Sequence, residues 1–223
     1  MNKTKITSLN KAQIKQIASE LYNNGPSFFR FSQRWRSYIC PFHLLIDLVP
    51  RNAKVFDVGC GAGLFLAILA HRKQISSGVG IDYSKQAIEL ADSMVENLPA
   101  NHNIEFLFLN AHAPWPDNQP NFISVIDVFH HVDPKQQKAL FSRIVDNVPP
   151  GGKLLYKDIA STPHWKAIAN KLHDLVLARE WINYVPIESI IQWGIEGGLE
   201  VTEKSHFEML WYSHDYLIFE RIN

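Results

Sequence analysis

Nine consecutive residues carry most of the information in this sequence: Val55-Phe56-Asp57-Val58-Gly59-Cys60-Gly61-Ala62-Gly63. The first four resemble the end of a buried strand, and an apolar helical pattern begins directly after the glycines. Glycine has no Cβ, so the backbone can turn tightly and a ligand can approach it, while the helix N-terminus offers unpaired N–H groups. A strand, a glycine turn and a helix in this order predict a nucleotide-binding site.

Strand and helix patterns alternate along the chain after this loop. Parallel strands need crossover connections, so the alternation predicts a doubly wound α/β fold with a seven-stranded, mostly parallel sheet. The last two strands follow each other without a helix between them, which predicts an antiparallel edge strand. The expected strands span residues 54–58, 78–82, 104–109, 122–127, 153–158, 199–207 and 214–221.

Two helical stretches precede the first strand. They are expected over residues 11–22 and 30–48, and they form an N-terminal helical cap over residues 1–50, with the nucleotide-binding domain over residues 51–223. Later helices are expected to start after the glycine loop, at Lys85, at Pro134 behind the N-cap Asp133, at Thr162-Pro163, and at Pro186 with an end at Gly197-Gly198.

Composition limits the class of protein. The chain has 223 residues with a 46% hydrophobic share, which fits one well-buried domain, and its formal net charge is zero. The apolar stretches are too short to span a membrane, and residues 1–10 lack the apolar core of a signal peptide. Two cysteines, Cys40 and Cys60, make no disulfide framework. We therefore expect a cytoplasmic protein.

The charge is unevenly distributed. Seven basic residues stand against Glu20 alone in the first forty positions, and aromatic residues lie among them. Such a segment could touch an anionic substrate, a membrane surface or nucleic acid, or it could simply be a solvated helical face whose aromatic residues pack inward. Peripheral membrane contact through these helices stays open, and the oligomeric state cannot be inferred.

Two acidic residues limit the class of ligand that the site could bind. Asp57 precedes the first glycine, where its charge would repel a pyrophosphate and attract a cationic ligand, which favours a zwitterionic sulfonium compound. Asp82 ends the next strand, about twenty residues further along, where a carboxylate can accept both hydroxyl groups of a ribose. A nucleoside is predicted in either case.

This pattern resembles class I S-adenosylmethionine-dependent methyltransferases, whose first motif is an acid followed by Gly-x-Gly-x-Gly. The resemblance covers residues 53–221, and it implies a Rossmann-like domain with S-adenosylmethionine as cofactor. The positions that carry it are Asp57, Gly59, Gly61, Gly63 and Asp82, the segment 122–131 that ends in His-His, and the turn Pro149-Pro150-Gly151-Gly152 before the fifth strand.

The resemblance also implies which residues bind the cofactor. Asp57 and the loop hold the methionine portion, Asp82 the ribose, Tyr83 flanks the adenine, Asn110 lies at the adenine edge, and Asp127 lies near the methionine or the transferred methyl. Asn110 departs from the family, which often has aspartate there, so an amide oxygen would accept from the adenine amino group. The full set is Asp57, Gly59, Cys60, Gly61, Gly63, Asp82, Tyr83, Asn110, Ala111 and Asp127.

Catalytic candidates follow the fourth and fifth strands, because ligands gather beyond the carboxyl ends of such strands. His130 is the first choice as a base, since an imidazole titrates near neutral pH. His131 is expected to be structural, because adjacent side chains at a helix start diverge. Asp158 could orient an acceptor or cap a loop. No metal is expected, since the two histidines have no partner at ligand spacing.

The sequence therefore predicts a methyltransferase for a small or medium-sized, non-polymeric acceptor bound between the cap and residues 161–186. The chain lacks the Asp/Asn-Pro-Pro-aromatic signature of methylases that act on the amines of bases, which disfavours nucleic acid. Two alternatives remain. One is a nicotinamide-dependent oxidoreductase, whose fingerprint needs a different glycine spacing, and the other is a non-catalytic S-adenosylmethionine-binding protein.

Overall fold

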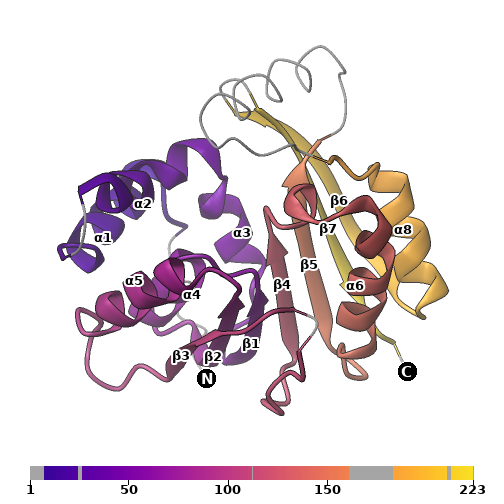
Figure 1. Ribbon diagram of the computed structural model, residues 1–223, viewed down its shortest axis with the longest axis horizontal. Helices are drawn as coiled ribbons and strands as arrows, with labels where there is room; N and C mark the ends of the chain where they lie inside the picture. The colour runs from indigo at the N-terminus through magenta and orange to yellow at the C-terminus, as the bar shows by residue number, and fades with distance from the viewer. Residues whose placement is uncertain (1–7, 25–26, 112, 161–182, 210–211, 223) are drawn as a thin grey trace.

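The computed structural model describes residues 8–24, 27–111, 113–160, 183–209 and 212–222. Seven strands form one sheet in the order β3-β2-β1-β4-β5-β7-β6 (Figure 1). All pairs are parallel except those that β7 makes with β5 and β6. The strands are β1 (Ala53–Val58), β2 (Ile75–Asp82), β3 (Ile104–Phe108), β4 (Phe122–Ile126), β5 (Lys153–Ile159), β6 (Glu200–Met209) and β7 (Tyr212–Glu220).

Helices cover both faces of this sheet, which gives it two apolar cores. One core joins the strands to α1, α3, α4 and α5, and the other joins them to α6 and α8. The helices are α1 (Lys11–Leu21), α2 (Ser27–Ile39), α3 (Phe42–Leu48), α4 (Leu64–His71), α5 (Lys85–Val95), α6 (Pro134–Asp146) and α8 (Ile187–Glu196), with a short 3-10 turn, η1 (Phe129–His131).

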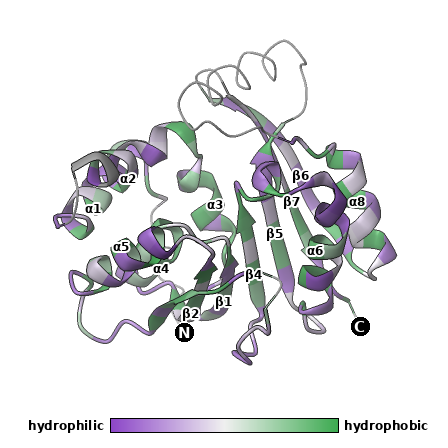
Figure 2. Ribbon diagram, in the orientation of Figure 1, coloured by the Kyte–Doolittle hydropathy of each residue, from purple (hydrophilic) through white to green (hydrophobic). Residues whose placement is uncertain are grey.

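The alternation of side chains along each strand explains the two cores. In β4, Phe122 faces one core and Ile123 the other, and every residue of this strand is buried. Figure 2 shows the hydrophobic colour concentrated in β4 and the adjoining strands, while the outer helices carry more polar residues. Burial on both faces is the reason why the central strands read as continuous apolar runs.

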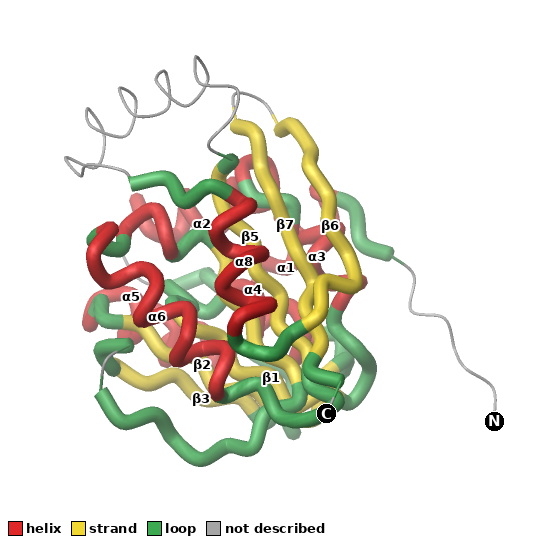
Figure 3. The backbone as a smooth tube through the Cα atoms, turned by 90° about the vertical axis from the view of Figure 1, so that its right-hand side faces the viewer, coloured by secondary structure: helices red, strands yellow, loops and turns green. Residues whose placement is uncertain are grey.

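The predicted sheet is confirmed. Its antiparallel member is β7, which lies between β5 and the edge strand β6. Figure 3 shows β6 and β7 side by side. The expected caps are also present, because Asp133 accepts from the N–H of Lys135 and α8 begins after Pro186. No helix in the described part of the chain is both long enough and apolar enough to cross a membrane.

One expected helix is wrong. The pattern over residues 30–48 predicted a single helix, but the structure has α2 and α3, with Cys40 and Pro41 between them. Proline lacks an N–H and disfavours a helical residue before it, so the helix ends and restarts at this point. The helix expected from Thr162 lies outside the described residues, and so do residues 161–182 of the acceptor-binding segment 161–186.

The N-terminal helices share their core with the rest of the chain. Ile14, Leu21 and Tyr22 of this segment are buried in the same cluster as α4, and the Tyr22 hydroxyl donates to the carbonyl of Ala62, at 2.5 Å. This contact ties the cap to the glycine loop. The division of the chain at residue 50 stays a prediction.

Three glycines of the loop after β1 have positive φ angles, which side chains rarely adopt. Gly63 has φ +79°, and a Cβ on it would lie 2.5 Å from Cε1 of Phe106, a buried ring of β3. Gly61 has φ +55°, but a Cβ on it would meet nothing within 4 Å. The two positions therefore separate backbone strain from overlap.

Replacing Gly63 with alanine should destabilise the protein by about 3 kcal/mol, because strain and overlap with Phe106 add, whereas Gly61→Ala should cost about 1 kcal/mol from strain alone. Urea unfolding of both variants measures the difference. Equal losses would contradict the role assigned to the Phe106 ring.

Candidate functional site

The site lies at the carboxyl ends of β1, β2 and β4, where Asp82 fixes the glycine loop. One oxygen of Asp82 accepts from the N–H of Gly61 and the other from the N–H of Ser84, both at 2.8 Å. The carboxylate therefore holds the turn after β1 against the turn after β2. These bonds also keep it oriented for a ligand.

Asp57 lies one strand away and is buried. It pairs in register with Ser124 of β4, whose hydroxyl donates to its carboxylate at 2.6 Å. Burial raises the pKa of Asp57 to about 7, although the Ser124 bond lowers it. No cationic side chain pairs with this carboxylate in the described residues, so a cationic group of a ligand would bind there favourably.

Two cavities meet at this edge of the sheet. The first, of about 330 Å³, lies between the glycine loop and α2, and the second, of about 240 Å³, lies beyond the end of β2. Together they have the size of a site for a nucleotide-sized molecule. Their shared wall consists of Gly59, Asp82, Tyr83, Asp127 and His131.

The second cavity suits a flat heterocycle. Its walls include Ile81, Leu109 and Val128, and Asn110 and Ala111 lie at its edge. Arg143 of α6 fixes this edge, because it donates to the carbonyl of Ala111 at 2.7 Å. Apolar walls with one amide group at the rim are the arrangement that an adenine ring requires.

The first cavity suits a zwitterionic tail. Asp57 and the glycine loop form one side of it, and Ser32, Gln33 and Arg36 of α2 form the other. A carboxylate on one side and a guanidinium on the other match the ammonium and carboxylate groups of an amino acid. No sequence pattern singled out the three α2 residues, so the prediction missed them.

Asp127 follows β4 with a φ of +58° and is paired twice. The Lys157 ammonium contacts one of its oxygens, and the Arg36 guanidinium lies 3.4 Å from the other. Burial alone would raise the pKa of Asp127, but Lys157 and Arg36 hold it well below its usual range. Burial lowers the pKa of Lys157 and Asp127 raises it, with an upward net shift. Both groups are therefore charged.

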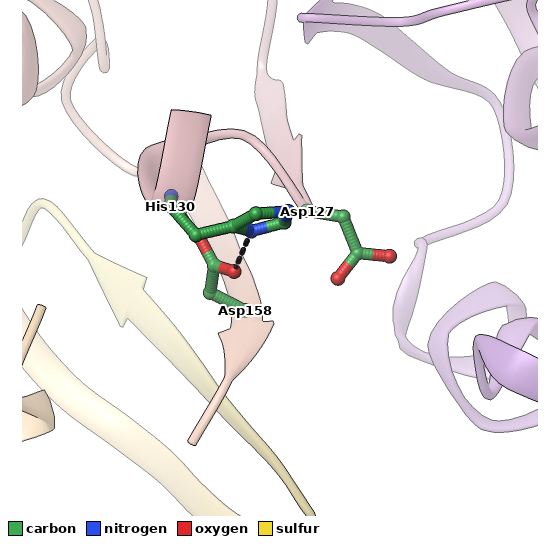
Figure 4. A group of neighbouring side chains, drawn as sticks. All are labelled: Asp127, His130 and Asp158. Atoms are coloured by element: carbon green, nitrogen blue, oxygen red, sulfur yellow. Dashed lines mark hydrogen bonds and ion pairs between the residues drawn. The ribbon is translucent and has the colours of Figure 1, made fainter. Parts of the chain in front are cut away.

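His130 and Asp158 form a buried pair beside Asp127 (Figure 4). Nδ1 of His130 lies 2.5 Å from Asp158 Oδ1, while Oδ2 of Asp158 accepts from the backbone N–H groups of Phe129 and His130. Burial lowers the pKa of His130, but the Asp158 carboxylate raises it further, and the net shift is upward. His130 therefore holds its proton more firmly than an ordinary histidine.

His131 lies on the wall that both cavities share, and its ring centroid is 4.0 Å from that of His130. The expectation that the two side chains diverge is wrong, because Asp158 anchors the His130 ring and the two rings pack together. Of the other predicted residues, Gly63, His130 and Asp158 are not among those that line these two cavities. Gly63 instead precedes α4 as its N-cap.

Three side chains bring potential metal ligands together, because Asp127, His130 and Asp158 each have a ligand atom within 4.8 Å of the others. The surrounding charges argue against a metal ion. Lys157 and Arg36 already neutralise Asp127, and Asp158 is engaged by His130 and by backbone N–H groups. Lys157 and Arg36 would repel a divalent cation, and the ion would have to displace the groups that already bind Asp158.

Comparison with known proteins identifies the family. Residues 32–204 match the family model described as a methyltransferase domain. The chain belongs to this family. The prediction of a class I S-adenosylmethionine-dependent methyltransferase is thereby confirmed, with S-adenosylmethionine as cofactor, and the nicotinamide alternative is set aside.

Curated relatives support the same family. The chain is 26% identical over 198 residues to a ubiquinone biosynthesis O-methyltransferase of Saccharophagus degradans, a match that covers 79% of this chain and 80% of that protein. It is 32% identical over 165 residues to an uncharacterized transposon protein of Streptomyces fradiae, covering 73% of this chain but only 44% of that protein.

Solved structures share the fold. Magnesium protoporphyrin IX methyltransferase from Synechocystis, with S-adenosylhomocysteine bound, has a TM-score of 0.67 at 16% identity over 95% of both chains. The N-methyltransferase NodS from Bradyrhizobium japonicum has a TM-score of 0.63 at 19% identity, covering 96% of this chain and 100% of that one. These likenesses extend over nearly the whole chain.

Cofactor affinity should depend on the protonation of Asp57. Below its pKa of about 7 the carboxyl is neutral and would no longer attract a cofactor ammonium group, so affinity should fall as pH falls. We expect the Kd of S-adenosylhomocysteine to rise about tenfold between roughly pH 7.5 and roughly pH 6. Calorimetric titration measures it.

The matched variant is Asp57→Asn, which keeps the size and the Ser124 contact but removes the titration. Its Kd should be weaker at neutral pH and nearly constant over the same range. A pH dependence that persists unchanged in Asp57→Asn would assign the effect to another group.

Proposed function

We propose that this chain transfers the methyl group of S-adenosylmethionine to a hydroxyl oxygen of a small or medium-sized, non-polymeric acceptor. The observation that carries the proposal is the position of His131. His131 lies on the wall common to the first cavity, assigned to the amino-acid tail, and the second cavity, assigned to the adenine ring. A hydroxyl nucleophile arrives protonated, so a general base at this place can remove its proton during the transfer.

The cofactor would be held along the two cavities. Asn110 and Ala111 would contact the adenine, Asp82 the ribose hydroxyl groups, Asp57 the ammonium and Arg36 the carboxylate. Cys60, Gly59 and Gly61 of the loop would bring their backbone close to it. When bound, the sulfonium supplies an activated methyl group, and the protein's task is to position the acceptor and exclude water.

His131 would act as the base, and His130 and Asp158 would position it. His131 would accept the acceptor's proton, because it is the histidine on the cavity wall. His130 is not among the residues that line the two cavities, and the Asp158 carboxylate raises its pKa, so less of it is free to accept a proton near neutral pH. We therefore assign His130, with Asp158, the positioning of His131 through the packed rings. This reverses the order of preference that the sequence suggested.

The relatives support transfer to oxygen. Two kinds of similar curated proteins carry the name O-methyltransferase, one in ubiquinone biosynthesis and one from Aspergillus nomiae. Others act on nitrogen by name, such as phosphoethanolamine N-methyltransferase 3 of Arabidopsis thaliana, which matches 53% of this chain. A nitrogen acceptor that arrives unprotonated would not need His131. The cytoplasmic location remains a prediction.

Asp82→Ala should weaken S-adenosylhomocysteine binding about 30-fold or more, because it removes charged hydrogen bonds to the ribose and frees the loop. Asp146→Ala is the matched control, since Asp146 is an exposed acid at the C-terminal end of α6 and lines neither cavity. Calorimetric titration compares them. Equal affinity of the Asp82 variant and the unchanged protein would reject the ribose assignment.

His131→Ala should lower methyl transfer about 100-fold or more, with a much smaller change in the Kd of S-adenosylhomocysteine. His71→Ala, at the end of α4, is the control. The assay follows labelled methyl from S-adenosylmethionine into the small-molecule fraction of a cell extract. Label in macromolecules would contradict the acceptor class, and binding without any transfer would favour the non-catalytic alternative.

A further inference from the structure

Four large apolar side chains are exposed on neighbouring turns of α2 and α3. The exposed fractions are 60% for Phe31, 40% for Trp35, and 41% for both Ile39 and Leu44. We call these four residues the α2–α3 face. They are half of the exposed large hydrophobic residues in the described chain, and no others are gathered in this way along the sequence. Gathered apolar surface of this kind marks a contact site.

The geometry of α2 makes the part of this face that lies on α2 continuous. Phe31, Trp35 and Ile39 are spaced by four residues, so they lie on one stripe of the helix. The ring centroids of Phe31 and Trp35 are 5.9 Å apart, and those of Trp35 and Tyr38 are 5.3 Å apart. The stripe is therefore a row of packed rings with one side open to solvent.

Basic residues border the stripe. Arg30 and Arg34 belong to α2 itself, and the Lys15 ammonium of α1 lies 3.6 Å above the Trp35 ring. The acids on the three helices are engaged elsewhere, because Glu20 accepts from Gln16 and Asp47 pairs with Arg72. The described charges of α1, α2 and α3 are Lys11, Lys15, Arg30, Arg34 and Arg36 against Glu20 and Asp47.

We propose that the α2–α3 face docks on the surface of an anionic lipid membrane. Aromatic side chains bordered by arginine and lysine fit the boundary between headgroups and acyl chains, where the rings insert and the cations meet lipid phosphates. A second copy of the chain fits less well. In a two-fold dimer this face would meet itself, which would bring Lys15, Arg30 and Arg34 against the same cations.

Docking in this way would have a consequence for the reaction. Another side of α2 carries Ser32, Gln33 and Arg36, which line the first cavity. A membrane on the α2–α3 face would therefore lie one helix away from the cofactor, within reach of an acceptor with an apolar tail. This last step rests on the proposed function, whereas the docking itself does not.

Sedimentation with vesicles tests the docking without cofactor or acceptor, so its outcome is independent of methyl transfer. The full chain should bind vesicles of phosphatidylcholine and phosphatidylglycerol in equal parts, should bind pure phosphatidylcholine far more weakly, and should dissociate as salt is raised. The double variant Phe31→Ser/Trp35→Ser should bind at least about tenfold more weakly. Arg34→Gln should weaken binding to the anionic vesicles alone.

Matched controls keep the test falsifiable. Ile195→Ser removes an equally exposed residue, 58% accessible, from α8 on the other side of the sheet, and should leave binding unchanged. Trp35→Phe keeps an aromatic ring and should bind nearly as well as the original chain. Unchanged circular dichroism and S-adenosylhomocysteine affinity would show that each variant is folded.

Three results would overturn the proposal. One is failure of the unchanged protein to bind the anionic vesicles, and another is binding that Phe31→Ser/Trp35→Ser does not weaken. The third is a doubled mass in light scattering without lipid that the same double variant abolishes, because the face would then join two copies of the chain.

Discussion

The site depends on a backbone turn that Asp82 holds in place. The chain leaves β1, passes through three glycines with positive φ, and enters α4, so it has no side chain at the points where a ligand must approach. Such a turn would be loose by itself. The bond from the Gly61 N–H to Asp82 attaches it to the end of β2, and the Tyr22 hydroxyl attaches it to the cap. Binding surface and rigid sheet are thus joined by hydrogen bonds.

Two buried acids at neighbouring strand ends show how environment sets charge. In the described part of the chain Asp57 accepts a side-chain hydrogen bond from the Ser124 hydroxyl alone, so burial dominates and raises its pKa to about 7. The Asp127 side chain is 11% exposed, and Lys157 and Arg36 overcome the effect of its burial and keep it ionised. The first acid therefore gains a partner when an ammonium group arrives, while the second already has its counterions. This difference identifies Asp57 as the acid with room for a cationic ligand.

Local patterns were sufficient to predict the strands, the glycine loop and the helix caps, because each depends on residues close in sequence. The interactions that shape the site join residues that are far apart in sequence. Arg36 reaches Asp127 across 91 positions, and Lys157 reaches it across 30. A lysine inside an apolar strand was a signal for Lys157, since a buried ammonium needs a counterion. Nothing in the sequence marked Arg36 among the other basic residues of its segment.

The histidine pair shows the same limit. Residue chemistry selected both histidines, but the choice between them depends on Asp158, which is 28 positions away and binds the ring of His130. That bond raises the proton affinity of His130 and leaves its neighbour on the cavity wall. The two counterions of Asp127 also differ, and this bears on how the cofactor is received. Lys157 is fully buried and in close contact, whereas the Arg36 side chain is 36% exposed and lies 3.4 Å away on α2. If Arg36 turns towards a cofactor carboxylate, Lys157 still neutralises Asp127, so the exchange leaves no buried charge uncompensated. A helix of the cap can therefore take part in binding at little electrostatic cost, because the sheet keeps its own ion pair.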